Sequence, residues 1–250
     1  MTALRVFPGR RPLMAPAIVT AAWAVVLAAD LTGVAGSLHH HALIEGGPPL
    51  PIATALFLLG WIVMIAAMMV PASLRAIEAV ELATERSPVL RRAAQRAGFL
   101  GAFAAVWSVF GLLAFFGDDL LHHVVGVTPW LVERPWLVSA GVLALAGAMQ
   151  FAPAKRRSLV ACRHPMARMP RTTLDSAVFG RLGLRHGLDC LGASWALMLL
   201  MFAEGFANPV WMAALTALMV YEVSGRHATQ AVSVSGVVLL LMALGTLTGA

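Results

Sequence analysis

Long apolar runs alternate with short polar segments along this chain. A helix needs about 20 mainly apolar residues to cross the roughly 30 Å hydrocarbon core of a bilayer. Several runs meet this length without an internal charge cluster. They predict transmembrane helices at about 15–36, 52–72, 98–117, 135–152 and 230–248.

A further apolar stretch, 191–222, is too long for one perpendicular crossing. It holds 32 residues and no basic residue, and at 1.5 Å per residue a single helix would be about 48 Å long. Gly205 and Pro209 lie near its middle, and together they indicate a break near 204–209. One tilted and kinked helix gives six spans, which we predict, while two short helices joined by a turn give seven.

Composition narrows the class of protein. Hydrophobic residues make up 60% of the chain and charged residues 12%, against roughly 45–50% and about 25% in soluble domains. These values exclude an ordinary water-soluble enzyme, a disordered chain and a disulfide-stapled secreted domain. Uninterrupted apolar runs also differ from the alternating strands of a transmembrane β-barrel. We therefore predict an all-α, polytopic membrane protein with a single helical domain over residues 1–250.

The basic residues predict the orientation in the bilayer. Of 18 Lys and Arg residues, 16 lie in the N-terminal segment, in 73–97 and in 153–190, which alternation of the spans places on one side. The opposite side has only Arg134. The positive-inside rule then places the N-terminus in the cytoplasm. The formal net charge of +6 is therefore explained by orientation in the membrane. The expected partner is the lipid bilayer, and no nucleic-acid partner is expected.

Soft metal ligands gather in three segments that this orientation places near the cytoplasmic boundary. Thiolates, thioethers and imidazoles are ligands for Cu(I) or zinc. The candidate ligands are Met64, Met68, Met69, Cys162, His164, His186 and Cys190. Two other interpretations stay open: the methionines are plain packing residues, and the basic segment around Cys162 binds anionic lipid headgroups.

A second set of candidate ligands lies on the predicted external side. The set consists of His39, His40, His41, His122 and His123. Imidazoles suit Zn(II), Cu(II) or Ni(II), so these residues are candidates for an entry or capture site, with solvated loop ends as the alternative. We find no nucleophile–base arrangement, phosphate loop or pair of catalytic carboxylates, and we expect no enzyme activity, no catalytic residue and no organic cofactor.

Three ordered motifs carry a family resemblance. They are Trp61, Met64, Ala67, Met68, Met69 and Pro71; then Lys155, Leu159, Cys162, Arg163 and Pro165; then Gly187, Cys190, Leu191, Gly192 and Trp195. Over about 55–222 the chain resembles the bacterial predicted metal-binding integral membrane proteins, a domain of unknown function sometimes labelled copper chaperone. The resemblance implies a copper chaperone or homeostasis protein of the bacterial inner (cytoplasmic) membrane.

The chain departs from the family pattern at three positions. Ser158, Ala193 and Ser194 stand where the family has cysteines. The two remaining thiols, with thioethers and imidazoles, are expected to hold one copper ion. The same departures leave open a non-catalytic structural or assembly subunit of a membrane complex, including one built around a copper enzyme. A small transporter, suggested by the break near 204–209, is the third interpretation.

Overall fold

The fold is built from α-helices. The computed structural model describes residues 14–37, 47–134, 136–165, 175–203 and 208–249, and every regular element within these ranges is a helix. The helices are α1 (Met14–Leu31), α2 (Val34–Ser37), α4 (Leu50–Ala72), α5 (Leu74–Thr84), α6 (Val89–Gly126), α7 (Pro129–Val132), α8 (Trp136–Gln150), α9 (Pro153–Arg163), α10 (Ser176–Ala203), α11 (Pro209–Ser224) and α12 (Ala228–Thr248). The all-α prediction is confirmed for this part of the chain.

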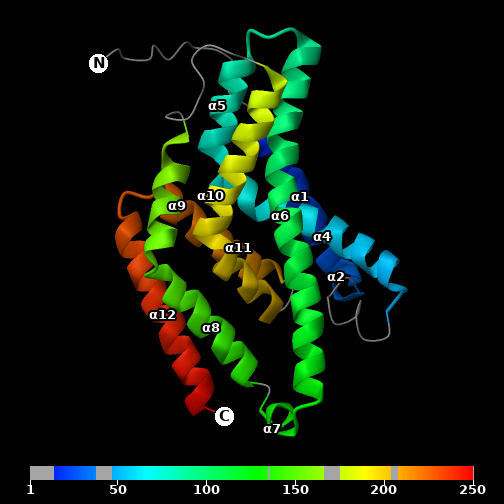
Figure 1. Cartoon of the computed structure of the whole chain (residues 1–250), viewed down its shortest axis with the longest axis vertical. Coiled ribbons are helices and arrows are strands. Elements are labelled where there is room, and N and C mark those ends of the chain that lie inside the picture. The colour runs from blue at the N-terminus through cyan, green and yellow to red at the C-terminus, as the bar shows by residue number, and fades with distance from the viewer. Residues whose placement is uncertain (1–13, 38–46, 135, 166–174, 204–207, 250) are drawn as a thin grey trace.

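Helix α6 runs along the whole length of the molecule (Figure 1). Its 38 residues correspond to about 57 Å, well beyond the roughly 30 Å of a hydrocarbon core. The N-terminal half of α6 packs closely against α10. A Cβ atom built on Gly183 would overlap the carbonyl oxygen of Phe99, and one on Gly187 would lie 3.0 Å from Val106. Glycines therefore bring these two backbones together.

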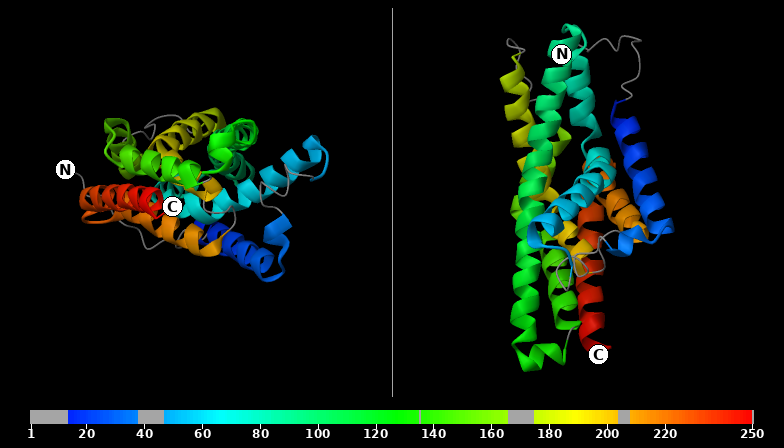
Figure 2. Two further views of the ribbon diagram at one scale, coloured as in Figure 1. Left: turned by 90° about the horizontal axis from the view of Figure 1, so that it is seen from below. Right: turned by 90° about the vertical axis from the view of Figure 1, so that its right-hand side faces the viewer.

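Helices α4 and α11 cross the molecule obliquely to α6 (Figure 2). In α4, Trp61 is fully buried, and its indole N–H donates to the carbonyl oxygen of Trp107 on α6 (2.8 Å). Its ring occupies the space left by Gly111. Around this contact lies one apolar core that is rich in methionine. Its methionines are Met64, Met68, Met69, Met198, Met201, Met212 and Met219.

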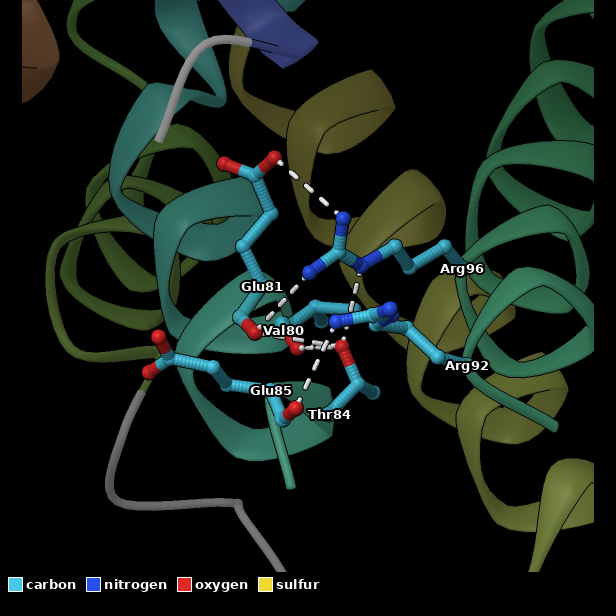
Figure 3. A network of polar contacts seen from close by, with 6 residues as sticks. All are labelled: Val80, Glu81, Thr84, Glu85, Arg92 and Arg96. Atoms are coloured by element: carbon cyan, nitrogen blue, oxygen red, sulfur yellow. Dashed lines mark hydrogen bonds and ion pairs between the residues drawn. The ribbon is translucent and has the colours of Figure 1, made fainter. Parts of the chain in front are cut away.

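Helices α5 and α6 form a polar hairpin at one end of the molecule (Figures 1 and 3). The guanidinium of Arg96 donates to the Thr84 hydroxyl (3.0 Å) and to the Glu81 carbonyl (3.2 Å), and lies 3.8 Å from the Glu81 carboxylate. Arg92 donates to the carbonyl of Glu85 (3.4 Å). The arginine-bearing segments 73–97 and 153–190, which lie between the predicted spans, are helical in α5, in α9 and in the first half of α10.

Within the part of the chain that the structure describes, four helices are long and apolar enough to cross a membrane, namely α1, α4, α6 and α12. A fifth span results if α8 and α9, bent by 63°, count as one. The apolar part of α10, 191–203, and the 16 residues of α11 are each about 20–24 Å long, short of a full crossing. The prediction of six spans is therefore not confirmed. The predicted break near 204–209 falls largely outside the described residues.

Candidate metal centre

Two sulfur atoms from different helices meet in the core. The Cys190 thiol of α10 lies 3.9 Å from the Met69 thioether of α4. The hydroxyl of Ser194 lies 3.8 Å from the same thioether, and that of Ser73 lies 3.9 Å from the Cys190 thiol. Cys190 and Ser194 share one face of α10 because they are four residues apart, and Ser194 donates to the Cys190 carbonyl (2.7 Å). We call Met69, Ser73, Cys190 and Ser194 the sulfur cluster.

The predicted methionine ligands are all buried, but they do not contribute equally. Met64 and Met68 share a helix face, whereas Met69 is rotated about 100° from Met68. All three are enclosed, since α4 packs against α1, α6 and α11. Met69 is the residue that reaches Cys190. Met64 and Met68 belong to the surrounding apolar core.

Cys162 lies on the buried face of α9 and belongs to the same core as Cys190. A Cβ built on Gly192 would lie 2.5 Å from the Ser158 hydroxyl. Ala161, further along α9, and Pro165, just beyond its end, line a cavity of about 30 Å³ with His186 and Asp189 of α10. The two helices are therefore antiparallel, and Cys162 lies near the turn of α10 that carries His186 and Cys190.

The two histidines predicted beside the thiols have different surroundings. His186 is 8% exposed, and its ring stacks on Phe99 and Phe103 with centroid distances of 5.9 and 5.7 Å. Helix α10 extends through it, so His186 lies one turn before Cys190. His164 is exposed at the end of α9. The arrangement makes His186, rather than His164, available to an interior site.

The predicted external ligands are only partly described. His39, His40 and His41 lie outside the described residues. His123 is exposed near the end of α6, and His122 is held by Asp118, whose carboxylate oxygen lies 3.4 Å from Nδ1. Within the described ranges, no three His, Cys, Asp or Glu side chains form a group that could hold a metal ion. The sulfur cluster is not a group of this kind, because the thioether that contacts Cys190 belongs to Met69, and methionine is not one of these four residue types.

A buried ion pair was not predicted from the sequence. The Lys155 ammonium of α9 lies 2.7 Å from the Glu222 carboxylate of α11, with side-chain exposures of 3% and 1%. In the sequence, Lys155 lies in the basic segment 153–190, and Glu222 is the last residue of the apolar stretch 191–222. Only the folded bundle brings them together, and no local signal pairs them.

The family comparison agrees with the motif resemblance. A family model described as "PpoB2: Copper chaperone" matches residues 58–246. No curated protein and no solved structure matches the chain. The matched region includes all of the sulfur cluster, Cys162 and the Lys155–Glu222 pair, and it covers well over half of the chain. This chain therefore belongs to the PpoB2 copper chaperone family.

Proposed function

We propose that this protein is a membrane-embedded copper-handling protein, a chaperone or homeostasis factor that carries one Cu(I) ion as cargo. Cys190 and Met69 are its central ligands, and Cys162 and His186 are the groups available to complete the site. The observation that carries the proposal is the 3.9 Å contact between the Cys190 and Met69 sulfur atoms inside the core. The proposal assigns no catalytic step.

The spacing of the two sulfurs suits a shared ion. A metal held about 2.3 Å from each of two sulfurs keeps them no more than about 4.6 Å apart, and the observed separation is shorter. Thiolate and thioether ligands select Cu(I) over harder ions. Binding requires the thiolate, so loading releases the Cys190 proton. An apolar surround of Met64, Met68 and Met198 keeps water away from the ion.

The bilayer is the proposed environment, and the exposed apolar surface of the helices supports it. Exposed side chains on α12 include Val234, Val237, Val238, Leu241, Leu244 and Leu247. Contiguous apolar surface of this kind is unusual on a soluble monomer. The arginine-rich α5–α6 hairpin and the start of α10 share one end of the molecule (Figure 1), which supports a common cytoplasmic side. We propose the bacterial inner membrane, with the N-terminus in the cytoplasm.

Titration of the full-length protein in lipid nanodiscs tests the proposed cargo. Under reducing conditions, with a chromophoric Cu(I) chelator as competitor, we expect about one tightly bound Cu(I) per chain, because soft sulfur ligands favour this ion. A tenfold excess of Zn(II) is expected to leave the Cu(I) in place. Complete loss of copper to the chelator, or equal displacement by Zn(II), would contradict the proposal.

Substitution of Ser194 by cysteine is expected to strengthen copper binding. The Ser194 hydroxyl already lies 3.8 Å from the Met69 thioether, and the family has cysteine at this position, so a thiol there supplies a further soft ligand. We expect Cu(I) affinity to rise about tenfold or more, measured by chelator competition. Ser139→Cys, at a half-buried position of α8, is the control and should leave affinity unchanged. An equal response to both substitutions would argue against this cluster.

An accessory-subunit role is the second candidate. It is favoured by the serines in the site, since Ser158 faces Gly192 and Ser194 touches Met69. Each occupies a position where the family has a cysteine. A copper-free protein that purifies with stoichiometric membrane partners would support this role over copper handling. A copper-loaded protein that purifies alone would count against it.

A further inference from the structure

The Lys155–Glu222 ion pair connects three helices. Besides the 2.7 Å contact with Lys155 of α9, the Glu222 carboxylate accepts a hydrogen bond from the Ser235 hydroxyl of α12 (3.5 Å). The Glu222 carbonyl accepts one from the Arg163 guanidinium of α9 (2.6 Å). Two of the basic residues of α9, Lys155 and Arg163, thus contact the same residue of α11. One contact lies near the start of α9 and the other at its end.

The ion pair and Cys162 share one face of α9. The buried residues of this helix are Lys155, Leu159 and Cys162, and their spacing of four and three residues defines a single helical stripe. Arg163, which also contacts Glu222, directly follows Cys162. The position of the Cys162 thiol is therefore coupled to how α9 is held against α11.

Packing between α8, α9 and α10 is incomplete beside Lys155. A small cavity of about 10 Å³ is lined by Gln150, Lys155, Gly192 and Ala193, among others. The Gln150 amide is buried and makes no hydrogen bond within the described part of the chain. The gap beside Lys155 is no larger than about one water molecule. Desolvating two charges is unfavourable unless their mutual attraction recovers it, and charged groups inside apolar bundles are usually functional.

We propose that Lys155 and Glu222 are positioning residues that hold α9 so that the Cys162 thiol faces the sulfur cluster. Neither residue is a copper ligand. The ion pair holds α9 in position, and the position of α9 determines where the Cys162 thiol lies. This inference rests on the proposed function for its purpose, but the position of Cys162 can be measured without any metal.

Alkylation of the two thiols in Glu222→Gln tests this positioning role. The substitution keeps the size of the side chain and removes its charge. In the metal-free full-length protein we expect maleimide to modify Cys162 about tenfold faster, because α9 opens locally, while the rate at Cys190 stays within about twofold. Peptide mass spectrometry separates the two thiols. The matched control is Glu81→Gln, which breaks the Arg96 ion pair of the α5–α6 hairpin and should alter neither rate.

Copper binding supplies the second measurement. Loss of a group that orients a ligand typically lowers metal affinity by about 10- to 100-fold, and we expect Glu222→Gln to fall in this range. X-ray absorption should show one sulfur fewer around the ion, with the remaining sulfur ligands kept. The exchanged pair, Lys155→Glu with Glu222→Lys, should restore both affinity and thiol protection. A merely structural role would lower thermal stability without changing the number of sulfur ligands.

A variant with an apolar pair in place of the ion pair tests the positioning role in a protein that is expected to stay folded. Lys155→Met with Glu222→Leu removes both buried charges, and such replacements often preserve or raise stability. We expect this variant to fold while Cys162 reacts faster. A folded variant with wild-type protection of Cys162, or an equal rise at Cys190, would overturn the positioning role. If wild-type protein binds no Cu(I) but Cys162 still responds to Glu222→Gln, the copper function fails and the positioning role stands.

Discussion

Replacing Cys190 with serine is expected to lower Cu(I) affinity by more than about 100-fold, beyond the 10- to 100-fold typical of residues that only orient a ligand. The thiol lies 3.9 Å from the Met69 thioether, and serine offers only a hard hydroxyl that Cu(I) binds poorly. Chelator competition on the reduced, nanodisc-embedded protein measures the effect. Thermal stability should change little, since serine and cysteine are close in size.

The neighbouring hydroxyl provides the control for this result. Ser73 lies 3.9 Å from the Cys190 thiol, so Ser73→Ala changes the same small region without removing a sulfur atom. We expect Cu(I) affinity to stay within a few-fold of the wild-type value. If Ser73→Ala and Cys190→Ser had equal effects, the loss would reflect disturbed packing, and Cys190 would not be a ligand.

Replacing Gly183 with alanine is expected to have the largest effect on stability. The added Cβ would overlap the backbone carbonyl of Phe99 on α6, and no side-chain rotation can relieve a clash with backbone. Overpacking of this kind usually costs about 1–3 kcal/mol, and we expect the upper end of that range. The measurement is the melting temperature in detergent, which should fall. Copper binding should be lost as well, because α10 carries Cys190.

Gly180, one turn earlier in α10, is the matched control. A Cβ there would meet its nearest neighbour, the Gly98 carbonyl oxygen, at 3.9 Å, which is an ordinary contact. Alanine in a helix is favoured over glycine by about 1 kcal/mol, so Gly180→Ala should leave the melting temperature unchanged or raise it. Equal destabilisation by both substitutions would show that the close approach of α6 and α10 is not the cause.

Apolar patterning predicted the helices that are apolar along their length. The run at 52–72 became α4 (Leu50–Ala72), and that at 230–248 became α12 (Ala228–Thr248). It did not predict α5 or α9 as helices, because their polar, arginine-bearing sequences carry no apolar run. Hydrogen bonds from Arg96 of α6 to Thr84 and Glu81 hold α5 against α6, and they do not require an apolar run.

The sequence predicted the candidate ligand residues of the site, but it did not predict which of them contact each other. The motifs pointed to Cys190 and to the methionines of 61–71, yet the residue that meets the thiol is Met69. That choice depends on how α4 rotates between α6 and α11, which only packing decides. The Lys155–Glu222 contact joins two residues that are far apart in sequence, so composition and spacing could not reveal it.

Copper content per chain tests the central claim most directly. Full-length protein is loaded with Cu(I) under reducing conditions, separated from free ion, and compared with the Cys162→Ser plus Cys190→Ser variant of equal melting temperature. Because soft sulfur ligands hold the cargo, we expect about one copper per chain in the wild type and almost none in the variant. Unchanged copper content in the variant would contradict a site built on these two thiols.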